Sequence, residues 1–248
     1  MFDEFATIAG STASVLLLPI FALQGTQVRK RTPKVPGAAG APFGTVTAGQ
    51  SALSLLFLGE STIEGVGAAT YADALVGQTA QTVAHLSQHT VHWHAVGKRG
   101  ATVRRTIQEL LPQVPKTTFD FAVVALGVND VLRFHRPARF RHEMTFLLSQ
   151  LRSQIGSVPV VLAAVPEVGR FPILPQPLRS GLGLRARAFN IGLERMSQRL
   201  PQVSLVKTEF IGGHELLCED HFHPSALGYQ QWGQQLGRAI AQQIGTEG

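Results

Sequence analysis

Short apolar segments alternate with longer amphipathic segments along the chain from about residue 51 onward. The apolar segments comprise residues 53–58, 91–96, 119–126, 158–165 and 203–206. Short runs that are continuously apolar are typical of parallel strands whose two faces are both buried. The amphipathic segments predict helices at residues 72–86, 101–111, 137–155, 182–200 and 226–244.

This alternation predicts an α/β fold, a three-layer α/β/α sandwich around a mainly parallel sheet of roughly five strands. In open sheets of this kind, ligands bind in the crevice beyond the carboxyl ends of the strands. Polar residues that directly follow a predicted strand are therefore the first candidates for function.

The N-terminal part of the chain has a different pattern. No charged residue occurs from Phe5 to Val28. A helix that rises ~1.5 Å per residue could cross the ~30 Å core of a bilayer over this length, although Pro19 interrupts it. By the positive-inside rule, the basic residues that follow predict a cytoplasmic main domain. These residues are Arg29, Lys30, Arg31 and Lys34.

We therefore expect residues 1–28 to be an apolar segment and a possible membrane anchor. Residues 29–50 are expected to be a basic linker rich in Pro and Gly, and residues 51–248 to be the main domain. The expected location is the cytoplasmic side of a membrane, or the cytoplasm if the segment does not anchor. The alternative for the apolar segment is a helix packed on the surface of the domain.

The composition of the chain narrows the possible functions. An apolar fraction of 44% is enough for a substantial core. The single cysteine, Cys218, excludes an intrachain disulfide and a cysteine-based zinc site. The net charge of +6 does not by itself predict nucleic-acid binding, because acidic residues are interspersed and no zinc-finger or RNP-like motif occurs. We expect no specific nucleic-acid partner.

Polar or conformationally free residues follow the first three predicted strands. Ser61 follows the first, Gly100 the second and Asn129 the third. A serine at a strand-to-helix turn is a candidate nucleophile, and an Asn amide could donate to a developing oxyanion. Each residue alone also has a structural interpretation, as a helix cap, a loop glycine and a turn residue respectively.

A fourth candidate group lies near the C-terminus, where the sequence reads Asp-His-Phe-His-Pro from Asp220 to Pro224. The spacing of three residues lets the Asp220 carboxylate reach the imidazole of His223. A carboxylate that fixes the orientation and tautomer of a histidine is what a general base requires. His221 lacks this spacing. The alternative is a pair of surface histidines beside a helix start.

At these residues the sequence resembles the SGNH (GDSL-type) hydrolase superfamily, over residues 51–244. The block from Gly127 to Asp130 reads Gly-Val-Asn-Asp, as it does in that family. The four signature residues of the family are matched in type, order and spacing by Ser61, Gly100, Asn129 and His223. The resemblance implies the flavodoxin-like form of the three-layer fold.

The resemblance also implies an activity, hydrolysis of acyl esters through an acyl-enzyme, with an ester or lipid as substrate. Ser61 is the implied nucleophile, His223 the base and Asp220 its orienting acid. The implied oxyanion hole comprises the N–H groups of Ser61 and Gly100 and the Asn129 amide. No metal or organic cofactor is implied. The alternative is a catalytically silent module of the same fold that binds lipid or glycan.

The first block departs from the family pattern at two positions, and at the second of them Thr62 stands where the family has Leu. The first block usually reads Gly-Asp-Ser, whereas this chain has Glu60 before the serine. Glu60 keeps the carboxyl group but adds one methylene. If the carboxyl group caps backbone N–H groups around the serine, this longer side chain must pack differently from the usual Asp.

Two neighbouring segments have open interpretations. Four arginines follow the Asn129 block and either meet an anionic substrate group or form a solvated helix start: Arg133, Arg136, Arg139 and Arg141. Residues 166–183 contain four prolines and several apolar residues. This segment is either a lid or wall for an acyl chain, or a packed connecting loop.

Overall fold

A six-stranded sheet in the order β1-β3-β2-β4-β5-β6 forms the centre of the protein. The structure is a computed structural model that describes residues 17–207 and 214–245. β1 pairs antiparallel with β3, and every other neighbouring pair is parallel. The strands are β1 (Phe43–Val46), β2 (Ala52–Gly59), β3 (Thr90–Gly97), β4 (Phe121–Ala125), β5 (Val160–Ala163) and β6 (Val203–Val206).

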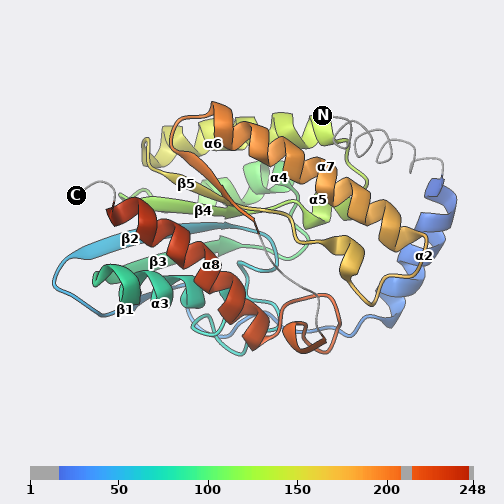
Figure 1. Cartoon of the computed structure of the whole chain (residues 1–248), viewed down its shortest axis with the longest axis horizontal. Helices are drawn as coiled ribbons and strands as arrows, with labels where there is room; N and C mark the ends of the chain where they lie inside the picture. Colours follow the sequence, from blue (N-terminus) through green and yellow to red (C-terminus); the bar gives the residue numbers. More distant parts are fainter. Residues whose placement is uncertain (1–16, 208–213, 246–248) are drawn as a thin grey trace.

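Helices cover both faces of this sheet (Figure 1). α3 (Leu75–Ser87) and α8 (Ala226–Gly245) lie on one face. The other face carries α4 (Val103–Arg105), α5 (Val128–Leu132), α6 (Pro137–Ile155) and α7 (Leu178–Arg199). This arrangement confirms the predicted three-layer α/β/α fold.

The central strand β2 explains why the strands are apolar throughout. Leu56 and Leu58 face the core on the α6–α7 side, whereas Leu55 and Phe57 face the core on the α3–α8 side. All four side chains are completely buried. A strand covered on both faces gains from apolar residues at every position, and its sequence therefore shows no alternation.

Two elements differ in detail from the prediction. The sheet has six strands rather than roughly five, because β1 lies inside the predicted linker. β1 is a half-exposed edge strand and lacks the apolar run that marks the others. The predicted helix at 101–111 is α-helical only in α4, and continues as a π-helical turn, Thr106–Leu110, and a 3₁₀ turn, Leu111–Gln113. Pro112 lacks an N–H group and does not support a regular helix there.

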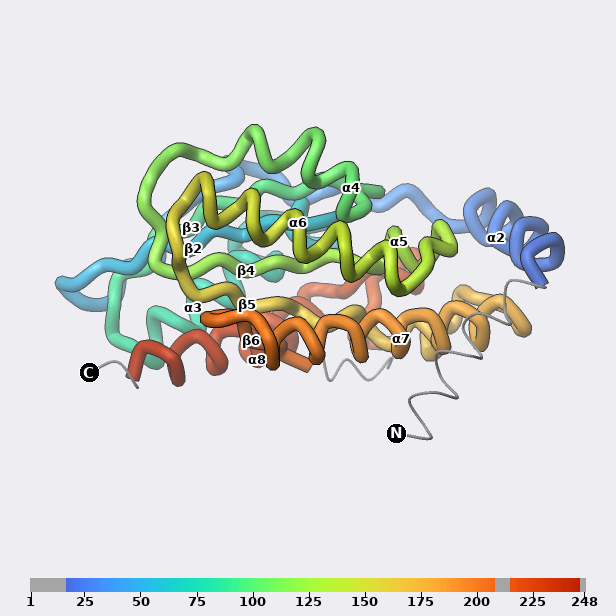
Figure 2. The backbone as a smooth tube through the Cα atoms, turned by 90° about the horizontal axis from the view of Figure 1, so that it is seen from above, coloured from blue at the N-terminus to red at the C-terminus, as the bar shows by residue number. Residues whose placement is uncertain are grey.

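The helix α2 (Leu18–Arg31) lies at one end of the molecule, beyond the sheet (Figure 2). Phe21 docks it, because its side chain is 1% exposed and stacks on Phe134 with ring centroids 5.5 Å apart. Gln24 donates to the Gln176 carbonyl over 2.7 Å and accepts from the Leu178 N–H over 3.1 Å. α2 therefore packs against the folded domain, as in the alternative interpretation of the apolar segment.

A bilayer-spanning helix is not found among residues 17–207 and 214–245, because none there is both long and apolar enough. The first 16 residues of the predicted anchor lie outside the described residues.

The strand order places a crevice at the carboxyl end of β2. The chain passes from β2 to β3 on one side and then crosses to β4 on the other side of β2. Connections leave in opposite directions from such a switch point, and the resulting crevice is where open α/β sheets bind ligands. Ser61 follows β2, Gly100 follows β3 and Asn129 follows β4.

Candidate active site

Ser61 occupies the turn after β2. Gly59 ends that strand, and a Cβ at this position would lie only 2.3 Å from the Ala125 carbonyl oxygen of β4. The glycine therefore permits the close approach of the two strands that bound the turn. Ser61 is 7% exposed, and its Oγ lies 3.1 Å from Nε2 of His223. Residues 162 positions apart in the sequence thus meet at the edge of the sheet.

Asp220 orients His223 from within the same loop. Its Oδ2 lies 2.6 Å from Nδ1 of the imidazole. Its Oδ1 accepts the N–H groups of Phe222 at 2.9 Å and of His223 at 2.8 Å, and the Cys218 thiol at 3.1 Å. The carboxyl group is thus fixed by the backbone that it caps. His221, in the loop between Asp220 and His223, has a left-handed backbone conformation with φ of +53°.

The charge state of Asp220 fixes the tautomer of His223. Burial raises the pKa of Asp220, but hydrogen bonds from the side chain and backbone of His223 outweigh it and hold the pKa well below its ordinary value. A carboxylate can only accept, so Nδ1 carries the proton of the neutral imidazole. Nε2 then presents its lone pair to Ser61 Oγ, which is the arrangement of a general base beside its nucleophile.

Two of the three candidate oxyanion donors are backbone N–H groups, and neither has a partner within the described parts of the chain. They belong to Ser61 and to Gly100. Ser61 is buried and Gly100 is half-buried. A buried N–H group without a partner is rare in folded proteins, so that of Ser61 in particular is available to a ligand. Gly100 has φ of +76°, and a Cβ there would meet only Arg105 Nη1, at 4.0 Å. The glycine therefore serves the backbone conformation rather than close packing.

Glu60 holds the third candidate oxyanion donor, Asn129. The Glu60 side chain crosses from β2 to the start of α5 and is almost completely buried. Oε1 accepts the Val128 N–H at 3.0 Å, and Oε2 accepts the Asn129 N–H at 3.1 Å. Oε2 also accepts one hydrogen of the Asn129 side-chain amide. Since that amide has two hydrogens, the second is left for a ligand.

Burial raises the pKa of Glu60 from 4.5 to about 8, although the N–H groups of Asn129 and Val128 act in the opposite direction. The carboxyl group is therefore mostly protonated at neutral pH. It holds the Asn129 block without placing a full negative charge beside it.

An apolar pocket adjoins Ser61 and has a volume of about 30 Å³. Ser61 and His223 form its polar side, and Leu126, Phe171 and Phe222 contribute apolar walls. The rings of Phe171 and Phe222 meet edge to face, with centroids 5.2 Å apart. Segment 166–183 therefore contributes both to the wall of the pocket and to the packed core. Phe171 lines the pocket, whereas residues such as Leu174, Leu178 and Leu182 pack in the core.

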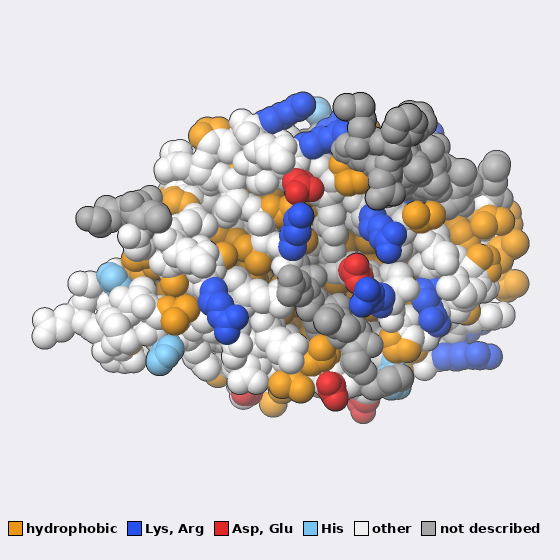
Figure 3. All heavy atoms as spheres, in the orientation of Figure 1, with side chains coloured by type: hydrophobic (Ala, Val, Ile, Leu, Met, Phe, Trp, Pro, Cys, Tyr) orange, Lys and Arg blue, Asp and Glu red, His pale blue; other side chains and the backbone are white. Residues whose placement is uncertain are grey.

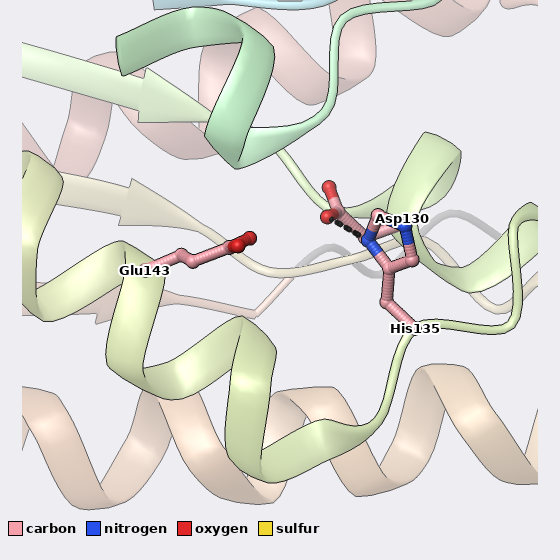
Figure 4. Close-up of side chains that lie close together, drawn as sticks. All are labelled: Asp130, His135 and Glu143. Atoms are coloured by element: carbon pink, nitrogen blue, oxygen red, sulfur yellow. Dashed lines mark hydrogen bonds and ion pairs between the residues drawn. The ribbon is translucent and has the colours of Figure 1, made fainter.

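A group that could ligate a metal begins at Asp130, directly after Asn129, among the residues that the structure describes. The ligand atoms of Asp130, His135 and Glu143 lie within 4.8 Å of one another (Figure 4). Asp130 and His135 already share a hydrogen bond of 2.8 Å. Burial raises the pKa of Asp130, although the bond from His135 lowers it. Arg139 pairs with Glu143 over 2.9 Å. These contacts engage Asp130, His135 and Oε1 of Glu143, whereas Oε2 of Glu143 is buried without a hydrogen-bond partner among the described residues.

The structure brings the predicted residues Ser61, Asp220 and His223 together, but two contacts were not predicted from the sequence. The link between Glu60 and Asn129 joins residues 69 positions apart, and only the departure from Gly-Asp-Ser hinted at it. The contribution of Phe222 to the pocket wall had no signal, because a Phe between two histidines shows no periodicity.

Comparisons with known proteins identify the family of the chain. The model of the GDSL-like Lipase/Acylhydrolase family matches residues 57–231, which is more than half of the chain. This range includes every candidate residue named above. No curated protein matches the chain in sequence at a significant level.

Solved structures show the same fold. A lipase, Lip_vut3, from a goat rumen metagenome is 20% identical, with a TM-score of 0.59 over 75% of this chain and 96% of that one. A lipase/acylhydrolase from Enterococcus faecalis is 21% identical, with a TM-score of 0.56 over 77% of this chain and 96% of that one. A family two carbohydrate esterase from Clostridium thermocellum is 14% identical, with a TM-score of 0.59 over 81% and 66% respectively.

The raised pKa of Glu60 predicts a pH-dependent stability. Between pH 4.5 and about 8 the folded state binds one proton more than the unfolded state at this residue. The free energy of unfolding therefore falls as the pH rises, by up to ~1.4 kcal/mol per pH unit. Urea unfolding at pH 5 and pH 7.5 measures this fall. We expect Glu60→Gln to reduce it, and Glu167→Gln, at a side chain that is 44% exposed, to leave it unchanged. An equal fall in wild type and Glu60→Gln would contradict the assignment.

Proposed function

The chain belongs to the GDSL-like lipase/acylhydrolase family and is a hydrolase of ester bonds; we propose that it cleaves acyl esters through Ser61, His223 and Asp220. One observation carries the proposal, the unbroken hydrogen-bonded series from Asp220 through His223 to Ser61, with distances of 2.6 Å and 3.1 Å. Nucleophile, base and orienting acid are thus aligned before a substrate binds.

In the proposed reaction, Ser61 Oγ attacks the carbonyl carbon of the ester while its proton passes to Nε2 of His223. Asp220 stabilises the imidazolium that forms, because it is ionised and bonded to Nδ1. The tetrahedral intermediate then collapses, and His223 returns the proton to the leaving alcohol. Water attacks the acyl-enzyme by the same route, and this regenerates Ser61 and releases the acid.

The negative charge of the tetrahedral intermediate requires fixed donors. We assign this role to the N–H groups of Ser61 and Gly100 and to the free hydrogen of the Asn129 amide. The unpartnered state of both N–H groups supports this assignment. The protonation of Glu60 also favours this assignment. An ionised carboxylate bonded to the Asn129 amide would repel the negative charge that develops on the oxyanion.

The size of the apolar pocket favours short acyl groups. A volume of about 30 Å³ is small compared with the ~150 Å³ of a cavity that holds benzene. An acetyl group fits with little rearrangement, whereas a longer chain requires movement of Phe171 or Phe222. We therefore propose small acyl esters as the substrate class.

The proposed nucleophile is tested with the 4-nitrophenyl esters of acetate, butyrate and octanoate. Wild type is expected to hydrolyse the acetate with the highest kcat/KM. Ser61→Ala should lower kcat by at least ~10⁴-fold without loss of thermal stability. Ser149→Ala, at an exposed serine, serves as the matched control. Near-wild-type turnover by folded Ser61→Ala would reject the assignment and favour the silent binding module.

The role of Asn129 predicts a kinetic signature. Its bond to the carbonyl oxygen strengthens as charge develops, so Asn129→Ala should lower kcat by ~10²–10³-fold and change KM little. Steady-state kinetics with 4-nitrophenyl acetate provide the measurement, with circular dichroism as the control for folding. An unchanged kcat with a raised KM would instead assign Asn129 to substrate binding alone.

We also propose that the chain associates with a membrane surface through α2. Phe21 faces the domain, while Leu17, Ile20 and Leu23 are 38%, 46% and 63% exposed. Apolar side chains gather at this end of the molecule, on the right of Figure 3. The last turn of α2 carries Arg29, Lys30 and Arg31. An apolar face beside cations suits the anionic cytoplasmic leaflet, so we propose this location.

Vesicle sedimentation tests the membrane proposal. The full chain should bind phosphatidylcholine vesicles that contain 30% phosphatidylserine more tightly than pure phosphatidylcholine vesicles. Ile20→Ser combined with Leu23→Ser should weaken binding to the anionic vesicles about 10-fold. Leu86→Ser, at a 50% exposed leucine far from α2, is the control. Equal binding by all three proteins would contradict this proposal.

A further inference from the structure

A shallow, open hollow of about 400 Å³ lies beside Gly100, and its lining includes four arginines and His135 together with one acidic residue, Glu109. We call it the basic cleft. Gly100 and Thr102 line it on the side of the candidate oxyanion hole. Its basic walls come from two segments that are far apart in the sequence, and they comprise Arg104, Arg105, Arg133 and Arg139. Of the four arginines after the Asn129 block, two line this cleft and two do not.

The charges in the basic cleft are only partly compensated. Arg105 pairs with Glu109 over 2.9 Å, and Arg139 pairs with Glu143 over 2.9 Å. The side chains of Arg104 and Arg133 are exposed and form no hydrogen bond or ion pair with any described residue. Two guanidinium groups therefore face one cavity with their donors unused.

The wall that carries Arg133 is fixed from the interior. His135 lines the cleft, and its Nδ1 is bonded over 2.8 Å to the fully buried Asp130 (Figure 4). Arg185 donates to the His135 carbonyl and lies 5.1 Å from the Phe134 ring centroid. The loop is thus preorganised, and the surrounding arginines favour an anion over a cation at this place.

We propose that the basic cleft binds an anionic group, phosphate or carboxylate, on the alcohol part of the ester substrate. The inference rests on the proposed function, in which the apolar pocket takes the acyl group. Gly100, which we assign to the oxyanion hole, also lines the basic cleft, so the cleft would border the carbonyl of a bound ester on that side. Planar guanidinium groups bind anionic oxygens in pairs of hydrogen bonds, which suits both phosphate and carboxylate.

Three acetate esters of increasing charge test this inference, namely phenyl acetate, 4-acetoxybenzoate and 4-acetoxyphenyl phosphate. The variant combines Arg104→Gln with Arg133→Gln. We expect it to lower kcat/KM for the two charged esters about 10-fold at low ionic strength, through KM, and to change phenyl acetate less than about twofold.

The control combines Arg136→Gln with Arg141→Gln, which removes two exposed arginines of the same run that do not line the cleft. This control should leave all three esters unchanged. Equal losses for charged and neutral esters, or the same losses in the control, would overturn the proposal.

Inhibition by inorganic phosphate tests whether the basic cleft, rather than the catalytic centre, binds the anion. It should compete with 4-acetoxyphenyl phosphate in wild type and leave phenyl acetate hydrolysis unaffected. Equal inhibition of both esters would mean that phosphate blocks the catalytic centre, and would overturn the proposal.

Failure of the proposed function gives a different result. If wild type hydrolyses none of the three esters, the catalytic assignment fails. The cleft is then tested alone by the rise in melting temperature that phosphate causes. A rise in wild type that is absent in the Arg104→Gln and Arg133→Gln variant supports an anion site, and no rise in either protein rejects it.

Discussion

The catalytic proposal depends on the bond between the Asp220 carboxylate and the imidazole of His223. Asp220 is nearly buried, and an isolated buried carboxylate would be costly. It stays ionised because it accepts the imidazole N–H and two backbone N–H groups of its own loop. The same contacts that stabilise its charge therefore direct the free nitrogen of His223 to Ser61. The conformation of this loop therefore determines both the charge of Asp220 and the orientation of His223.

Glu60 also positions a site residue through hydrogen bonds, but as a mostly neutral carboxyl group rather than an ionised one. Its carboxyl group joins β2 to the start of α5 and holds Asn129 by backbone and side chain. Desolvation raises its pKa to about 8, so the group is mostly neutral at physiological pH. A buried acid can thus position an oxyanion donor while adding little negative charge beside the oxyanion. The extra methylene of Glu60, relative to Asp, is compatible with these hydrogen bonds to Val128 and Asn129.

Much of the fold could be predicted because strands buried on both faces must be apolar throughout, as in β2 and β4. The half-exposed edge strand β1 and the π-helical turn at Thr106–Leu110 could not, because neither produces a strong periodicity. The candidate site residues could be found because each follows a strand or fills a motif. Two features depend on the order of the strands, which residue patterns do not encode. They are the hydrogen bonds between Glu60 and Asn129 and the position of Arg104 and Arg133 on the same cleft.

The most direct test of the central claim is fluorophosphonate labelling, followed by mass spectrometry of the labelled peptide. This reagent reacts with a serine only where a neighbouring base activates it. The account predicts a single label on Ser61 in wild type, and labelling slowed by orders of magnitude in folded His223→Gln. An unlabelled Ser61 in folded wild type, or equal labelling rates in the two proteins, would contradict it.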